Sequence, residues 1–501
     1  MDDLRKELEL LAHLDGVSSL LSWDQETYMP KGAIRARSEQ LAALSGIRHD
    51  RLTSAAFQSI LNQYVCLESG KPIQPVTERD RLILFRVFQD WRKAKQIPSA
   101  FVSSFAALKS QSQHVWQEAR DCNDFALFAP YLEKCVAMST EQAQMMNPDL
   151  PAYDTLLDEF EEGSSVSVLN PLFLELKDEL QLLLLHILEK RKATKLFLGR
   201  TFDIQKQWDF GMKVLGEMGF DFNRGRQDRS THPFTTQFHP TDVRVTTRLS
   251  PDNFLEALSS TIHEGGHALY EQGLQSDYFG TALCESVSLG FHESQSRLWE
   301  QMIGMGAAFW SHYYPILQSY FPESLNDVDS QLFYHAINTV SKSLIRVEAD
   351  EVTYNLHIVI RYECEKMLFD KTLSVASLPG VWNQKYKDYL GVMPSSDCEG
   401  VLQDVHWSCA LFGYFPTYTL GNLYAAHLYE QMRKDFDIEE KISQGQLKAV
   451  MEWNRDHIHC HGRLFSPKEL LEKVCHCTLS TGPFLSYLNK KYLEKIGRAH
   501  V

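Results

Sequence analysis

The sequence predicts a mostly α-helical protein, because apolar residues recur at helical spacing along much of the chain. The pattern is clear in the first turns, at Leu4, Leu8, Leu11 and Leu14. Asn170 and Pro171 are typical of an N-cap and a first-turn proline, so a helix is expected from there through Leu188. No linker, repeat or low-complexity tract interrupts the sequence. We therefore expect one domain over residues 1–501.

Charge and composition exclude several classes of protein. The chain has 501 residues and a net charge of -15, which disfavours nucleic acid and anionic membranes as partners. The first residues lack the basic and apolar regions of a signal peptide. The most apolar run, Leu182 to Leu188, is too short to cross a bilayer. With 44% hydrophobic and 23% charged residues, the composition is that of an ordinary globular protein.

The ten cysteines lack the spacing of a disulfide framework. We expect them to be reduced thiols, and the protein to be cytoplasmic. One segment, 457–477, gathers histidine and cysteine, the residue types of a structural zinc site. Its spacing fits no familiar zinc finger, so a second metal site there is not expected.

β-Branched residues gather between Phe234 and Leu249, on both sides of the turn-prone pair His239 and Pro240. This pattern predicts a short β-hairpin. An edge strand at this place could pair with an extended peptide, or the hairpin could be only a structural flap. The sequence leaves both interpretations open.

The segment that follows the hairpin contains His263, Glu264 and His267 in the arrangement H-E-x-x-H. On a helix each residue advances about 100°, so the two histidines share one face and can bind one ion. Glu264 projects to one side, where its carboxylate can act on a water molecule. Gly265 and Gly266 weaken a helix, which suggests that substrate or a neighbouring backbone approaches closely there. The pattern is typical of zinc-assisted peptide hydrolysis.

A catalytic zinc ion needs a third protein ligand and an open position. Glu293 is the first candidate, because 26 residues after His267 leave room for a turn and a second helix. Arg297, four residues later, could orient its carboxylate. Glu271, Glu285 and His292 remain alternatives from the residues alone.

The chain also resembles the carboxypeptidase Taq family of metallocarboxypeptidases over nearly its full length. The resemblance rests on motifs in the family's order: His232-Pro-Phe234, Asp242-Val-Arg-Val-Thr246, His263-Glu-Gly-Gly-His267, His292-Glu-Ser-Gln295, Ile345-Arg-Val-Glu-Ala-Asp350 and Gly400-Val-Leu-Gln-Asp-Val-His-Trp407. Two further stretches, Leu21-Ser-Trp-Asp-Gln25 and Gly413-Tyr-Phe-Pro-Thr-Tyr418, are similar to the family as well.

The resemblance implies His263, His267 and Glu293 as metal ligands and Glu264 as the general base. It also implies Arg346 as a residue that binds the substrate's terminal carboxylate, and Arg244 in the same role or in limiting peptide length. His406 and Tyr418 could stabilise an oxyanion. From the residues alone, Arg346 and Asp350 are read as a surface i, i+4 pair, and His406 and Tyr418 as packed core residues.

The implied activity is removal of C-terminal residues from peptides with broad specificity. One divalent ion is expected, zinc or else cobalt, in a helical fold with a deep substrate cleft; residues 201–501 would form the catalytic region and 1–200 a helical N-terminal region. The expected partners are peptides and a second copy of the chain. An oligopeptidase that cuts internal bonds and a non-catalytic scaffold are the alternatives. The sequence departs from the family at Ala410 and in Val474-Cys-His-Cys477, where glycine is usual.

Overall fold

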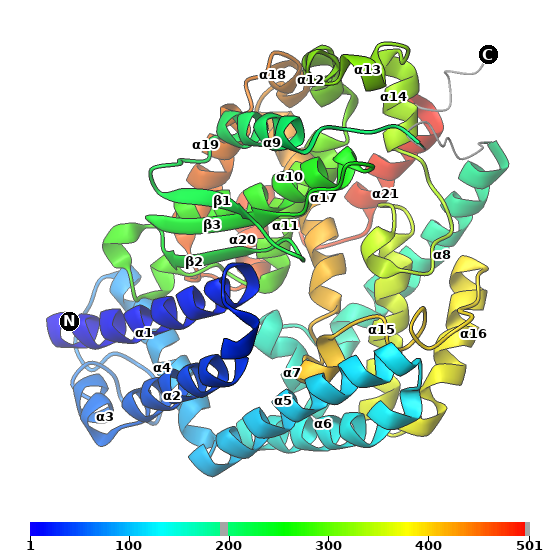
Figure 1. Ribbon diagram of the computed structural model, residues 1–501. Helices are drawn as coiled ribbons and strands as arrows, with labels where there is room; N and C mark the ends of the chain where they lie inside the picture. Colours follow the sequence, from blue (N-terminus) through cyan, green and yellow to red (C-terminus); the bar gives the residue numbers. More distant parts are fainter. Residues whose placement is uncertain (191–198, 496–501) are drawn as a thin grey trace. The chain divides into compact units, whose positions relative to one another are not determined.

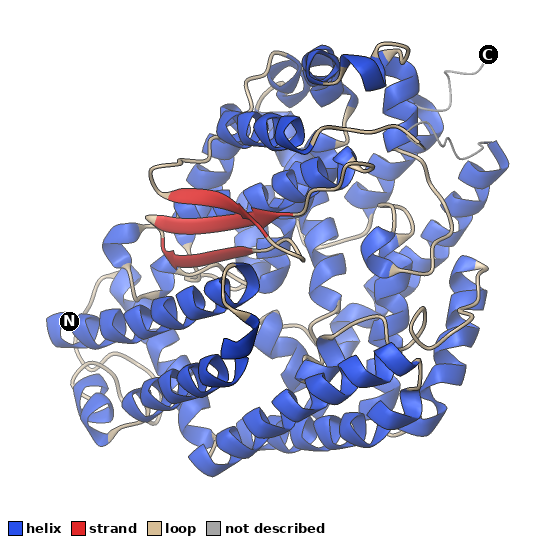
Figure 2. Cartoon of the chain, viewed as in Figure 1, coloured by secondary structure: helices blue, strands red, loops and turns tan. Residues whose placement is uncertain are grey.

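The computed structural model describes residues 1–190 and 199–495, and these residues are mostly helical, as the sequence predicts (Figures 1 and 2). The helices are α1 (Asp2–Thr27), α2 (Ile34–Leu52), α3 (Ala55–Leu61), α4 (Glu78–Gln96), α5 (Ser99–Cys122), α6 (Phe125–Met146), α7 (Ala152–Phe160), α8 (Val166–Lys190), α9 (Ile204–Met218), α10 (Phe254–Gly273), α11 (Leu289–Arg297), α12 (Ala307–Tyr320), α13 (Pro322–Leu325), α14 (Ser330–Ile337), α15 (Tyr354–Phe369), α16 (Leu378–Leu390), α17 (Pro416–Asp435), α18 (Ile438–Ser443), α19 (Lys448–His457), α20 (Pro467–Cys475) and α21 (Gly482–Asn489). Among the described helices, none has both the length and the hydropathy to cross a membrane.

The chain divides into two compact units, each assembled from segments that are distant in the sequence. Unit 1 comprises Met1–Ser99, Leu196–Ile337 and Leu428–Cys477, and unit 2 comprises Ala100–Lys195, Asn338–His427 and Thr478–Val501. The H-E-x-x-H segment lies in unit 1. The Arg346 and His406 motifs lie in unit 2.

Helix α1 opens unit 1 and confirms the periodicity at the start of the chain. Leu4, Leu8 and Leu11 are buried in an apolar core with residues of α3 and α4, such as Leu61 and Leu84. Leu14 is only partly buried. The leucine stripe therefore joins the N-terminal helices of this unit to one another.

The predicted hairpin is present as β2 (Thr235–His239) and β3 (Asp242–Thr247), which pair in antiparallel register. A third strand, β1 (Gly225–Arg229), was not predicted; it is polar and pairs in parallel with β3. A side chain at Gly225 would come within 2.1 Å of the Val243 carbonyl oxygen, so glycine allows this pairing. The strand order is β1-β3-β2, and β2 and β3 both contact α10 (Figure 1).

Helix α8, in unit 2, begins earlier than expected. It starts at Val166, whose backbone N–H donates to Asp154 Oδ1 at 2.7 Å, and Pro171 lies inside the helix. Asn170 is not the N-cap, because its side-chain oxygen accepts a hydrogen bond from the Tyr362 hydroxyl at 2.8 Å. The Asn-Pro pair has the residue types of a helix start, but here the asparagine serves a tertiary contact.

Helix α10 holds the H-E-x-x-H segment. Its two adjacent glycines leave room for neighbouring helices of the same chain, which pass close to both. A side chain at Gly266 would lie 2.7 Å from the Gln295 carbonyl oxygen of α11, and one at Gly265 would lie 2.8 Å from Leu215 of α9. The expected close approach of a neighbouring backbone is therefore found at Gly266. This contact sets α10 and α11 against each other and thereby positions the site.

Candidate active site

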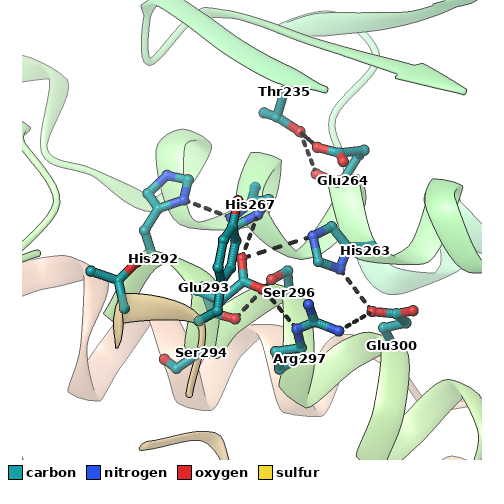
Figure 3. Close-up of polar contacts among 12 residues, drawn as sticks. Thr235, His263, Glu264, His267, His292, Glu293, Ser294, Ser296, Arg297 and Glu300 are labelled. Atoms are coloured by element: carbon teal, nitrogen blue, oxygen red, sulfur yellow. Dashed lines mark hydrogen bonds and ion pairs between the residues drawn. The ribbon is translucent and has the colours of Figure 1, made fainter. Parts of the chain in front are cut away.

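The side chains of His263, His267 and Glu293 converge from α10 and α11 (Figure 3). One nitrogen or oxygen atom from each lies within 4.8 Å of the others. Glu293 Oε2 is 3.5 Å from His267 Nε2 and 3.9 Å from His263 Nε2. Two imidazole nitrogens and a carboxylate oxygen are donors that suit a divalent ion of the zinc type. The residues present thus fit such an ion.

Two of these three side chains are held by charged neighbours that the sequence places on one helical face. Arg297 Nε donates to Glu293 Oε1 at 2.6 Å, the contact that the i, i+4 spacing indicates. Glu300 Oε2 lies 2.8 Å from His263 Nδ1 and accepts its N–H, and Glu300 Oε1 accepts from the Ser259 hydroxyl at 2.7 Å. Glu300 belongs to a π-helical turn, Leu298–Gly304, that continues α11.

Burial and charge together shift the pKa values in this cluster. Burial lowers the pKa of His263, but the carboxylates of Glu293 and Glu300 outweigh it and raise the value to about 9. Burial raises the pKa of Glu300, but His263 and Arg297 bring it to about 2. The pKa of His267 falls to about 3 because of burial and the adjacent His292. The carboxylates therefore stabilise positive charge at His263, whereas His267 is neutral.

Glu264 points away from the ligand atoms, toward β2 (Figure 3). The Thr235 hydroxyl lies 2.7 Å from Glu264 Oε2, to which it donates, and 2.9 Å from the Glu264 backbone oxygen. Burial raises the pKa of Glu264, while His263 and the Thr235 hydrogen bond oppose the rise. The hairpin thus fixes one oxygen of this carboxylate beside the two histidines.

The alternative ligands have other partners. Glu285 pairs with Arg463, whose Nε lies 2.7 Å from Glu285 Oε2. His292 and Glu271 contact each other, with 2.6 Å between His292 Nε2 and Glu271 Oε1. None of these three alternatives belongs to a group of side chains that could hold a metal ion. Within residues 1–190 and 199–495, the segment 457–477 contributes no residue to such a group either.

Arg244, on β3, lies over aromatic rings in unit 1. Its guanidinium carbon is 4.4 Å from the centre of the Trp23 ring and 4.7 Å from that of Phe238. Arg244 Nε also donates to Asp242 Oδ1 at 3.0 Å. The rings and the aspartate hold the guanidinium in one orientation.

Arg346 is buried in unit 2 and does not pair with Asp350, so its interpretation as half of a surface pair is wrong. Arg346 Nε donates to Asp404 Oδ1 at 2.9 Å, and Arg361 Nε donates to Asp404 Oδ2 at 2.7 Å. Asp350 instead accepts from backbone N–H groups, including that of Thr353 at 3.0 Å. Two buried guanidiniums therefore share one carboxylate.

His406 and Tyr418 contact each other in unit 2, with 3.1 Å between His406 Nε2 and the Tyr418 hydroxyl. Burial and the neighbouring Arg346 lower the pKa of His406 to about 3, so the ring is neutral. His406 Nδ1 is buried and has no hydrogen-bond partner among the described residues. A buried polar atom of this kind is a candidate to bind a ligand.

Comparison with known proteins now decides the family. The carboxypeptidase Taq (M32) metallopeptidase family matches residues 3–492. Thermostable carboxypeptidase 1 of Thermus thermophilus is 41% identical over 499 residues, 97% of each chain. Carboxypeptidase 1 of Bacillus subtilis is 37% identical over 97% of this chain and 96% of its own. The crystal structure of the M32 carboxypeptidase from Deinococcus radiodurans R1 has a TM-score of 0.95 at 38% identity and 99% coverage of both chains.

This chain belongs to the carboxypeptidase Taq (M32) family. It is therefore a metal-dependent carboxypeptidase, and it works with a divalent metal ion. The resemblance in the sequence motifs is confirmed, and the alternatives of an oligopeptidase and a non-catalytic scaffold are not favoured.

The two departures from the M32 pattern occupy special backbone positions. Ala410 has φ 55 and His476 has φ 54, both in the left-handed region, where glycine is the least strained residue. His476 ends α20 as its C-cap. The departures thus strain the backbone at two turns, and neither residue is one of the proposed ligands.

Several residues of the site were not found by sequence reasoning. Glu300 follows Glu293 by seven residues, two helical turns, so its place on the same face could have been noticed. Asp404 and Arg361 had no comparable signal, because each meets Arg346 only through the tertiary fold.

Proposed function

We propose that His263, His267 and Glu293 bind the divalent ion, and that this ion is zinc, with cobalt as the alternative. The observation that carries the proposal is the convergence of three suitable donor atoms within 4.8 Å. The carboxylates of Glu293 and Glu300, which both lie near His263, add the negative charge that a dication requires. Bound there, the ion would supply Lewis acidity to the scissile carbonyl and to the attacking water.

Glu264 is the proposed general base. It takes a proton from the attacking water and returns it to the departing amine. Its buried position, which raises the pKa of its carboxyl, makes it a stronger base than an exposed glutamate. Thr235 holds one carboxylate oxygen, which keeps the group oriented while it exchanges the proton.

Arg346 is proposed to bind the terminal carboxylate of the peptide. It shares Asp404 with Arg361, which leaves an excess of positive charge that an anion would balance. Arg244, oriented by Trp23 and Phe238, is proposed to serve the same carboxylate or to limit peptide length.

His406 and Tyr418 are proposed to stabilise the oxyanion. When the Tyr418 hydroxyl donates to His406 Nε2, the imidazole proton lies on Nδ1, the atom without a partner among the described residues. That N–H is then a donor in a buried setting, where it is worth more than in water.

Broad specificity, a deep substrate cleft, a cytoplasmic location and a homodimer complete the proposal. All ten cysteines are free thiols, which supports a reducing compartment. The homodimer and the cleft follow from the family resemblance. Sedimentation equilibrium of the purified chain tests the dimer.

The decisive experiment measures hydrolysis of blocked dipeptides with varied C-terminal residues after metal removal and stepwise restoration of Zn²⁺ or Co²⁺. We expect activity to return with one ion per chain. His263→Ala should lose the ion by elemental analysis, and His186→Ala, an exposed histidine on α8, should keep it. Full metal content and activity in His263→Ala would contradict the proposed site.

A further inference from the structure

His267 and His263 make different contacts with the nitrogen that faces away from Glu293. His263 Nδ1 meets the carboxylate of Glu300 directly, at 2.8 Å. His267 Nδ1 meets another imidazole, with 2.6 Å to His292 Nδ1. His292 Nε2 in turn lies 2.6 Å from Glu271 Oε1. A second imidazole and then a carboxylate therefore stand behind His267. Figure 3 shows the contact between the two imidazoles.

The proton positions in this series of hydrogen bonds follow if His267 binds the ion through Nε2. A neutral histidine that binds an ion through Nε2, the atom 3.5 Å from Glu293 Oε2, carries its proton on Nδ1. His267 Nδ1–H then donates to His292 Nδ1, which must be an acceptor. The proton of His292 consequently lies on Nε2 and is donated to Glu271. Each nitrogen thus has one role, and the carboxylate at the end selects the tautomers of both rings.

Packing fixes the same rings. His292 lies edge to edge with His267, with 4.5 Å between ring centres and 25° between planes. His292 also stacks on Tyr270, with 5.4 Å between ring centres and 28° between planes. Tyr270 is fully buried, and its hydroxyl accepts the Val287 N–H at 3.1 Å. The ring of His292 therefore has little freedom to rotate.

The local sequence explains why these residues meet. Glu271 follows His267 by four residues on α10, so both lie on one helical face. His292 precedes Glu293 on α11, the helix whose backbone passes Gly266. The same close packing of α10 and α11 that brings Glu293 to the histidines also brings His292 to Glu271 and His267.

We propose that His292 and Glu271 are positioning residues that hold the tautomer and orientation of His267 for metal binding. Partners of this kind typically change metal affinity about 10- to 100-fold when they are removed. The inference rests on the proposed function, because it requires His267 to be a ligand. It assigns to His292 a role outside the ligand set: His292 and Glu271 together orient His267, as Glu300 alone orients His263 by direct contact.

The test compares His292→Phe with the parent and with His459→Phe. Phenylalanine keeps a ring between His267 and Tyr270 but removes both nitrogens. His459 is the matched control, since it is buried and stacks on the same Tyr270 at 4.7 Å without touching a ligand. The dissociation constant and release rate of Zn²⁺ are measured by chelator competition. The melting temperature of the metal-stripped proteins reports on folding.

We expect His292→Phe to bind Zn²⁺ about 10- to 100-fold more weakly, and His459→Phe to bind it as the parent does. Glu271→Gln keeps an acceptor near His292 Nε2 and should cause a smaller loss. That variant also decides the matter if phenylalanine lowers the stability of the stripped protein. The inference is overturned if Zn²⁺ affinity is unchanged in both variants while His263→Ala loses the ion. If His263→Ala retains the ion, the proposed function itself fails.

Discussion

Two buried clusters of this protein carry opposite excess charge. The histidine cluster of unit 1 combines His263 and His267 with one guanidinium and four carboxylates: Arg297, Glu264, Glu271, Glu293 and Glu300. The arginine cluster of unit 2 combines two guanidiniums with one carboxylate: Arg346, Arg361 and Asp404. Unbalanced buried charge is costly, so the first cluster suits a cation and the second an anion.

Charge balance can therefore indicate the kind of ligand where geometry alone does not. A divalent ion and a peptide's terminal carboxylate are the two charged partners that a metal-dependent carboxypeptidase must hold. Each cluster is short of the charge that one of these partners brings. Substitutions that alter the charge of each cluster therefore test the assignment.

The largest effect is expected in the histidine cluster, for Glu264→Gln. The amide cannot accept the proton of the attacking water, so turnover should fall by about 10²- to 10⁴-fold while the ion stays bound. Steady-state kinetics and elemental analysis of the same preparation measure both. Glu256→Gln makes the same chemical change on α10 outside the cluster and should leave both unchanged. A metal-loaded Glu264→Gln with parental turnover would remove Glu264 from the mechanism.

The second effect belongs to the arginine cluster and uses Arg346→Gln. Loss of charge-assisted hydrogen bonds to a carboxylate should reduce kcat/KM by about 10- to 100-fold, mainly through KM. In this variant Asp404 still pairs with Arg361, so the arginine cluster changes from a net positive charge to neutral. Zn²⁺ content should not change, which separates this cluster from the histidine cluster. Arg120→Gln, an exposed arginine of α5, is the control.

A substrate with an amidated C-terminus sharpens the same prediction. The parent should cleave it far more slowly than the free acid, and Arg346→Gln should discriminate little between the two. If the variant and the parent show the same preference for the free acid, Arg346 does not read the terminal carboxylate.

The two clusters also differ in how far sequence could predict them. Within the histidine cluster, His263 and His267 are four residues apart on one helix, and local periodicity is enough to bring them together. Glu293 could be ranked only first among four candidates, because its place depends on how α11 packs against α10. The contacts of His292 depend on the same packing and could not be predicted, so His292 was expected only as a possible ligand.

In the arginine cluster, residue spacing was misleading. Arg346 and Asp350 have the spacing of a helical pair, but the chain there forms only a short 3-10 turn, Arg346–Glu348, and Arg346 turns to Asp404. Polar strand β1 was missed for a related reason, since its pairing with β3 is a long-range contact without a local pattern. Periodicity was enough to predict the helices. It could not predict that Asp404 pairs with Arg361, 43 residues away, or with Arg346, 58 residues away.

The third prediction concerns pH and a carboxyl of unit 2 outside the arginine cluster. The paired guanidiniums hold the pKa of Asp404 low despite its burial. Burial raises the pKa of Glu365 to about 7, although Trp407 and Tyr153 donate to its carboxylate. A raised pKa gives stability that is complete below the ordinary value of 4.5 and is lost as pH rises through 7.

Glu365→Gln removes this dependence. Between pH 4.5 and pH 8, the free energy of unfolding of the parent should therefore fall relative to the variant by about 3 kcal/mol. Urea unfolding at several pH values measures the difference, and the hydrogen bonds altered by the amide add an offset that does not depend on pH. A difference that stays constant across this range would mean that burial does not raise the pKa of Glu365 above its ordinary value of 4.5.

The smallest effect tests whether the two units bear the same backbone strain. Ala410, in unit 2, and His476, in unit 1, both have left-handed φ values, where a side chain costs roughly 1 kcal/mol or more relative to glycine. Ala410→Gly and His476→Gly should each raise the free energy of unfolding by about 0.5–1 kcal/mol, since glycine's extra unfolded-state entropy offsets part of the relief. Ala349→Gly is the control, because Ala349 has φ -71 and glycine there should only destabilise. If all three substitutions destabilise alike, the left-handed turns carry no strain, and the departures from the family's glycines cost the fold nothing.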